Sequence, residues 1–83
     1  MSRSDTFKVI IGQPNQETIY VETNGSMQIY ELKQRISMQT GVTVPSFTIL
    51  AGGVELDDNQ TVGFYEIQPN SMAHMAIKAI GGR

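Results

Sequence analysis

The residues with the clearest chemical potential are the last three, Gly81, Gly82 and Arg83, which close the segment HMAIKAIGGR. Glycine has no side chain to pack and loses the most conformational entropy on ordering, so two adjacent glycines add little to a folded core. The pair is therefore either a slack end or a strip of backbone thin enough to enter a narrow site on another protein.

The other side chains give little support for catalysis or metal binding. The 83 residues include no cysteine, which excludes disulfides, thiolate metal sites and a cysteine nucleophile. One histidine, His74, cannot form a metal site alone, and we interpret it as a half-exposed strand residue. The net charge of -2, with six Lys and Arg that form no basic run, disfavours nucleic acid as the main partner. No apolar run approaches the roughly 20 residues of a membrane-spanning helix.

Apolar periodicity predicts the elements that must position the tail. Ser26 is the preferred N-cap of the helix, although Gln28, a weaker cap, would open the apolar stripe more closely. Gly41 is the expected stop because glycine adopts the left-handed conformation at low cost. The predicted elements are, in chain order, strands over 7–11 and 18–23, a helix within 27–40, strands over 47–51 and around Leu56, a loop or short helical turn over 60–68, and a strand over 72–78.

This order of elements is that of the β-grasp, an α+β fold in which one helix covers a mixed sheet of four or five strands. A chain of 83 residues makes one small domain. We expect the domain to span residues 7–79, with a flexible N-terminal extension over 1–6 and a flexible tail over 80–83.

Several segments of the chain form one recognisable pattern: TI at 18–19, LKQRI at 32–36, Gly41, ELDDNQTVGFYEIQPNS at 55–71, His74 and the diglycine. Through these segments the chain resembles ubiquitin and the ubiquitin-like modifiers without a gap from Phe7 to Gly82. In the family pattern the tyrosine at the position of Tyr65 packs under a loop and bonds the backbone through its hydroxyl. The resemblance therefore implies the β-grasp fold and a structural role for Tyr65.

The resemblance implies a protein modifier that has no catalytic residue of its own. In family modifiers the carboxylate of the second glycine, here Gly82, is adenylated, passed to enzyme cysteines as a thioester and joined to a lysine by an isopeptide bond. Because Arg83 follows, the resemblance implies a precursor trimmed after Gly82. Gly81 and Gly82 suit a narrow enzyme channel in which Cβ atoms would clash, with Ala79 and Ile80 leading into it.

The implied partners are an activating enzyme, a conjugating enzyme, a ligase, a processing protease, ubiquitin-like-binding domains and target proteins. ATP is used by the activating enzyme, so we expect this chain to bind no cofactor. We further expect a monomer that is cytoplasmic, and also nuclear in a eukaryotic cell, with no nucleic-acid or membrane partner.

The family's partner-binding patch falls here on Pro14, Leu50 and Ala76, with His74 beside them. Leu50 keeps an apolar anchor, but Pro14 and Ala76 are stiffer or smaller than the aliphatic residues of ubiquitin. At about 25 cal/mol per Å² of apolar burial, the missing methyl groups weaken a partner by about 1–2 kcal/mol. We therefore expect receptors for ubiquitin to bind this chain poorly.

The lysines separate this chain from ubiquitin itself. Lys8, Lys33 and Lys78 are the candidate acceptors. Lys33 matches a largely packed helix lysine of the family, which favours a structural role. The lysines that ubiquitin uses most for chains fall on Glu17, Val54 and Pro69, so those linkages cannot form.

The approach to the tail also departs from ubiquitin. Lys78 matches an arginine that activating enzymes inspect, and it keeps the charge without the planar fork of arginine. Ala79 follows, and the next basic position of the family is Ile80 here. These residues predict a dedicated activating enzyme or poor recognition by that of ubiquitin.

Two other functions fit the same resemblance. A non-covalent ubiquitin-like interaction module would keep Arg83 and use its surface alone. A sulfur carrier also combines a β-grasp with a C-terminal diglycine, but converts its carboxylate to a thiocarboxylate. We rank the sulfur carrier last because residues 55–71 resemble ubiquitin more than such carriers.

Overall fold

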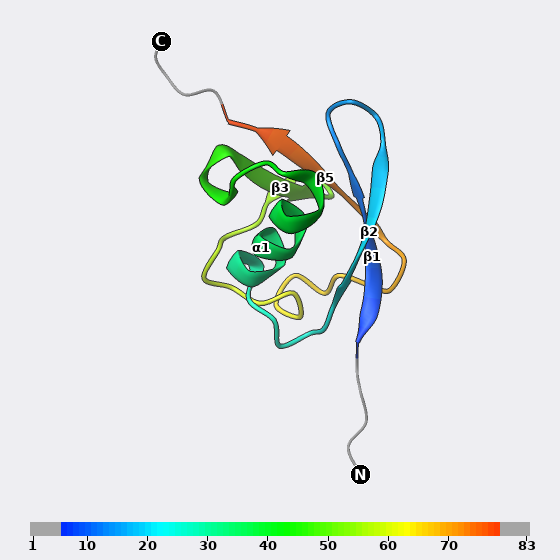
Figure 1. Ribbon diagram of the computed structural model, residues 1–83. Helices are drawn as coiled ribbons and strands as arrows, with labels where there is room; N and C mark the ends of the chain where they lie inside the picture. Colours follow the sequence, from blue (N-terminus) through cyan, green and yellow to red (C-terminus); the bar gives the residue numbers. More distant parts are fainter. Residues whose placement is uncertain (1–5, 79–83) are drawn as a thin grey trace.

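The structure is a computed structural model that describes residues 6–78. One helix packs on one face of a five-stranded sheet (Figure 1), which confirms the predicted α+β β-grasp architecture. The sheet order is β2-β1-β5-β3-β4, with β1 and β5 parallel and the other neighbours antiparallel. The elements are β1 (Phe7–Gly12), β2 (Thr18–Thr23), α1 (Ile29–Thr40), the 3-10 turn η1 (Val44–Ser46), β3 (Phe47–Ala51), β4 (Val54–Glu55) and β5 (Met72–Ile77).

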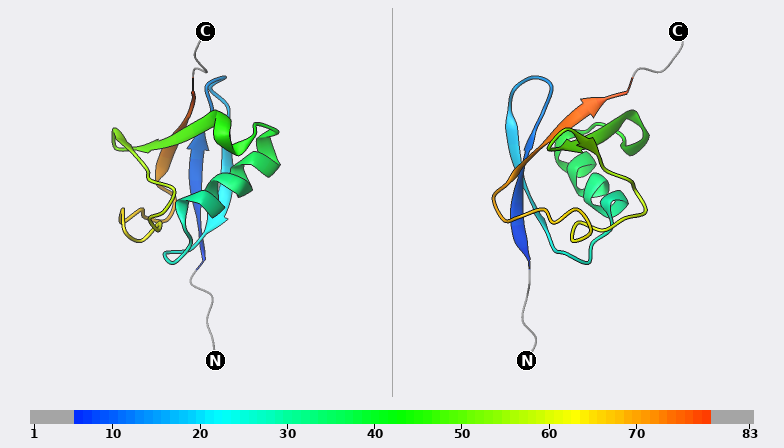
Figure 2. Two further views of the ribbon diagram at one scale, coloured as in Figure 1. Left: turned by 90° about the vertical axis from the view of Figure 1, so that its left-hand side faces the viewer. Right: turned by 180° about the vertical axis from the view of Figure 1, so that it is seen from behind.

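The core lies between α1 and the inner face of the sheet (Figure 2). The predicted helix stripe of Ile29, Leu32 and Ile36 is fully buried, as a helix that covers a sheet requires. Alternate strand residues complete the core, because successive side chains of a strand point to opposite faces. The largest buried strand residues are Val9, Ile11, Val21, Phe47 and Ile49.

The helix begins at Ile29, within the predicted range, and its N-cap is Gln28, the weaker of the two candidates, instead of the preferred Ser26. The side chain of Gln28 makes no capping hydrogen bond. The first amide groups of α1 instead donate to a distant loop: Ile29 N–H to the Gln60 carbonyl at 2.8 Å, and Tyr30 N–H to the Asp58 carbonyl at 3.2 Å. Carbonyl groups of this distant loop therefore accept hydrogen bonds that a capping side chain accepts in other helices.

The C-terminal end of the helix follows the prediction. Gly41 has a φ of 80° and donates its N–H to the Ser37 carbonyl at 2.8 Å. A left-handed residue at this position is the common helix stop for which glycine is favoured.

The segment between β4 and β5, residues 56–71, contains turns and no regular helix or strand. The short strand β4 ends at Glu55, one residue before the position where the sequence placed it, and Leu56 is buried in the core instead. As predicted, the Tyr65 hydroxyl bonds the backbone, where it accepts the Asp57 N–H at 2.9 Å. Val62 is fully buried, and its N–H donates to the Met27 carbonyl.

The free edge of β2 is covered by side chains from α1. Gln39 Nε2 donates to the Tyr20 carbonyl at 3.1 Å, and Arg35 Nη1 donates to the Glu22 carbonyl at 3.2 Å. Unpaired backbone groups on an edge strand invite pairing with another chain. These two bonds reduce that tendency along the edge of the sheet.

The fold is tightest where the loop crosses the turn before α1. A Cβ atom on Gly63 would lie 2.8 Å from the Gly25 carbonyl oxygen, whereas a Cβ on Gly25 would lie 3.9 Å from its nearest neighbour, Gly63 Cα.

We expect Gly63→Ala to lower the free energy of unfolding by about 1–3 kcal/mol, because backbone must move to relieve the overlap. Gly25→Ala is the matched control and should change it by less than about 1 kcal/mol. Urea unfolding measures both, and equal effects would contradict this account.

Candidate functional site

The patch predicted from the resemblance lies on the outer face of the sheet, opposite α1. Leu50 on β3 pairs with His74 on β5, and Ala76 lies two residues farther along β5 on the same face. Leu50 and Ala76 are half-buried and His74 is exposed. Pro14 is exposed in the turn after β1. The strand register therefore brings three of the four predicted residues together.

A glycine in the neighbouring strand makes room for the histidine. Gly12 on β1 pairs with His74, and a Cβ on Gly12 would lie 3.0 Å from the imidazole Nδ1. The ring thus lies directly over the β1 backbone. A larger residue at this position would push the ring away from the patch.

The outer face carries a second apolar group that sequence reasoning did not assign to a site. Ile10 on β1 pairs with Tyr20 on one side and with Met72 on the other. Tyr20 is 57% exposed and Met72 is 47% exposed. We call Ile10, Tyr20 and Met72 the outer cluster. Strand alternation already placed Met72 on the His74 face, but only the sheet order shows that Tyr20 joins it.

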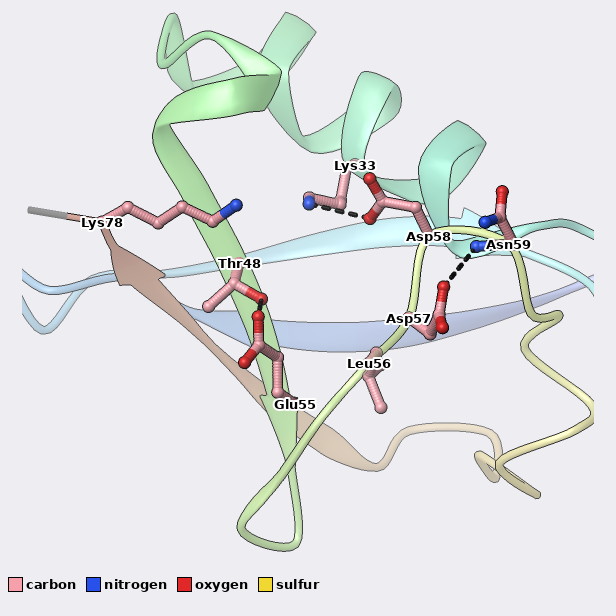
Figure 3. A pocket seen from close by; sticks show the side chains of 8 residues that line it. All are labelled: Lys33, Thr48, Glu55, Leu56, Asp57, Asp58, Asn59 and Lys78. Atoms are coloured by element: carbon pink, nitrogen blue, oxygen red, sulfur yellow. Dashed lines mark hydrogen bonds and ion pairs between the residues drawn. The ribbon is translucent and has the colours of Figure 1, made fainter. Parts of the chain in front are cut away.

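The tail residues Ala79, Ile80, Gly81, Gly82 and Arg83 lie outside the described residues. The structure does fix the position from which the tail continues. Lys78 follows β5, and its N–H donates to the Ser46 carbonyl at 2.8 Å, which attaches the end of the sheet to η1. The side chain of Lys78 is exposed and lines a polar pocket with Glu55 and Asp58 (Figure 3).

The same pocket contains the buried ion pair of the fold. Lys33 on α1 is 3% exposed, and its Nζ lies 2.9 Å from an Asp58 carboxylate oxygen in the loop before β5. The amine also lies 5.7 Å from the centroid of the Phe47 ring, within cation–π range. Thr48 donates to Glu55 across the pocket at 2.9 Å. These contacts give Lys33 a structural position and remove its amine from solvent.

The described residues supply no constellation for metal chemistry, because residues 6–78 contain no group of three or more His, Asp or Glu that could hold a metal ion. In the same range, no helix has the length and hydropathy required to cross a bilayer.

Loss of Asp58, the partner of Lys33, should destabilise the protein more than loss of the neighbouring Asp57. We expect Asp58→Ala to lower the free energy of unfolding by about 1–3 kcal/mol, because it leaves the Lys33 ammonium buried without its carboxylate. The 43% exposure of the Asp58 side chain keeps the loss below that of a fully buried pair.

Asp57→Ala is the matched control for this pair. The Asp57 carboxylate accepts the Asn59 N–H in an exposed turn, so its loss should cost less than about 1 kcal/mol. Urea unfolding of both variants tests the assignment. Equal losses would show that the ion pair contributes no more than an exposed turn.

A comparison with protein-family models agrees with the fold. The model of the ubiquitin family matches residues 6–80, which include the whole of the domain expected over residues 7–79. The match covers every strand, the helix, the loop that contains Tyr65 and the approach to the tail. The chain therefore belongs to the ubiquitin family.

Proposed function

We propose that this chain is a ubiquitin-like modifier that is joined to lysines of target proteins through the Gly82 carboxylate. The observation that carries the proposal is the position of the diglycine directly after a β-grasp domain. Lys78 is attached to η1 at the end of the sheet, and Gly82 follows four residues later. Four extended residues reach at most about 14 Å, so the domain itself must dock close to an enzyme that acts on Gly82.

The chemistry takes place at the tail and requires no side chain of this protein. ATP bound by the activating enzyme supplies an adenylate on the Gly82 carboxylate and releases pyrophosphate. A cysteine thiolate of the enzyme then displaces AMP to give a thioester. A lysine amine of the target attacks the thioester carbon, which forms the amide C–N bond and releases the thiolate. Gly81 and Gly82 let this backbone pass where a Cβ would collide with the channel walls.

In this proposal a protease first cleaves after Gly82, because only a free carboxylate there can be adenylated. In this proposal the identities of Lys78, Ala79 and Ile80 select the activating enzyme. The chain acts as substrate and signal, with no enzymatic activity and no bound cofactor. Its partners are the activating and conjugating enzymes, a ligase, the protease and the domains that read the modifier, and we place these events in the cytoplasm.

A tagged chain expressed in its native cells tests this proposal. We expect the wild-type chain to give a ladder of high-mass species, and Gly82→Val to abolish it because the branched side chain blocks the enzyme channel. Deletion of Arg83 is the control: it supplies the mature end and should keep the ladder. A ladder that survives Gly82→Val, or the absence of any ladder with both the wild-type and the Arg83-deleted chains, would overturn the proposal.

The outer face favours a second candidate, a non-covalent interaction module. Leu50 and the outer cluster expose apolar side chains on one side of the sheet, and such groups commonly mark protein contacts. This module would bind partners without cleavage at Gly82. A sulfur carrier is the third candidate, and a thiocarboxylate mass on the purified protein would establish it.

The reduced patch makes a quantitative prediction for both binding candidates. Ala76 is half-buried beside Leu50 and His74, so Ala76→Val adds apolar surface at the centre of the patch. Two added methyl groups should tighten an isolated ubiquitin-binding domain by about 1–2 kcal/mol, or roughly 5- to 30-fold. A calorimetric titration measures this change. Ubiquitin-like affinity in the wild-type chain would contradict the claim that the patch is reduced.

A further inference from the structure

The three lysines of this chain differ sharply in access. The Lys33 amine is buried and bonded to Asp58, so it cannot reach a reactive carbonyl without disruption of the core. Lys8 and Lys78 are both exposed. Within residues 6–78, the structure shows no hydrogen bond or ion pair for either of these two amines.

Lys78 lies too close to its own reactive end to serve as an acceptor in a working modifier. Gly82 follows it by four residues, which span at most about 14 Å. An enzyme that holds the Gly82 carboxylate must therefore cover the Lys78 side chain. A second copy attached at Lys78 would occupy the same space and block activation of the unit that carries it.

Lys8 lies at the opposite end of the sheet. β1 and β5 are parallel with Ile10 beside Met72, so Lys8 precedes the level at which β5 begins. From Met72 to Lys78 the strand advances about 20 Å, and Lys8 is farther away still. Figure 1 shows the start of β1 and the end of β5 at opposite ends of the molecule. An enzyme at the tail thus leaves Lys8 uncovered.

The surroundings of Lys8 also suit an approaching protein. Its side chain points away from the core, because the neighbouring Val9 is buried and successive strand residues face opposite sides. Figure 2 shows that α1 packs on the other face of the sheet. Glu22 is directly opposite on β2. Ile10, a member of the outer cluster, lies two residues farther along β1 on the same face. A partner that brings a carbonyl group to Lys8 therefore has an apolar surface beside the amine on which to rest.

We propose that Lys8 is the lysine through which copies of this modifier are linked to one another. The inference rests on the proposed function, because it requires a second copy carried as a Gly82 thioester. The neutral Lys8 amine attacks the thioester carbon, the C–N bond forms as the C–S bond breaks, and the thiolate returns to the enzyme cysteine. The amine loses one proton to solvent, and the product is an isopeptide bond between Lys8 and Gly82.

Tryptic digestion of high-mass species from native cells tests the linkage. Trypsin cleaves after Lys78, so a donor tail that ends at Gly82 leaves residues 79–82 attached to the acceptor lysine. Modification blocks cleavage at Lys8. We therefore expect the peptide of residues 4–33 to carry this four-residue remnant in mass spectra.

The outcomes separate this inference from the proposed function. Remnants on lysines of other proteins with none on Lys8 would overturn the inference and leave the proposed function intact. The same holds if Lys33, Lys78 or the N-terminal amine carries the remnant in place of Lys8. The absence of the remnant from every protein would overturn the proposed function as well.

Substitution of the lysine provides an independent test. We expect Lys8→Arg to lose species that contain linked copies of this chain while it keeps single copies attached to other proteins. Gln34→Arg is the matched control, since it places the same new side chain on the exposed face of α1 and should retain the linked copies. Linked copies that persist in Lys8→Arg would overturn the inference.

Discussion

Hydrogen bonds between the N-terminus of α1 and the loop before β5 join two parts of the domain that lie far apart in the sequence. The first amide groups of the helix donate to the carbonyls of Gln60 and Asp58, and the Asp58 carboxylate bonds Lys33 one turn into the helix. The same loop then reaches β1, where Asn70 N–H donates to the Lys8 carbonyl at 2.7 Å. The position at which β5 begins follows from this path.

The proposed reactive group is therefore separate from the residues that stabilise the fold. The proposed reactive group is a carboxylate at the end of a thin segment, whereas the core and its one buried ion pair within residues 6–78 hold the sheet that carries it. In the proposed function, side chains on the outer face, such as Leu50 and Tyr20, select the partners. Changes on that face can therefore alter recognition at little cost to stability.

Much of the fold was predictable because local patterns and tertiary structure agree. Alternation gave β1 and β2, the spacing of Ile29, Leu32 and Ile36 gave α1, and Gly41 gave its end. The preference for Ser26 over Gln28 as the N-cap was wrong because the amide groups of the helix find their acceptors about 30 residues away, a pairing that no local pattern encodes. An extended segment was predicted around Leu56, whereas β4 ends one residue earlier, at Glu55. Leu56 is buried as an inward-facing strand residue would be, so its apolar side chain favoured a strand at that position.

The candidate site was less predictable than the fold. The resemblance placed Leu50, His74 and Ala76 on one face, and the register shows them together. Tyr20 and Met72 join through Ile10 only because β5 lies beside β1, and periodicity alone does not give the order of strands. The resemblance gave Lys33 a largely packed position, but it did not give the partner of Lys33, Asp58, which is 25 residues away.

In the proposed function, the Gly82 carboxylate is the group that is joined to other proteins. The most direct measurement is the intact mass of the free protein recovered from its native cells. The account predicts a pool of chains whose last residue is Gly82. A pool in which every chain retains Arg83 would contradict it, and the outer face of the sheet would then account for the function.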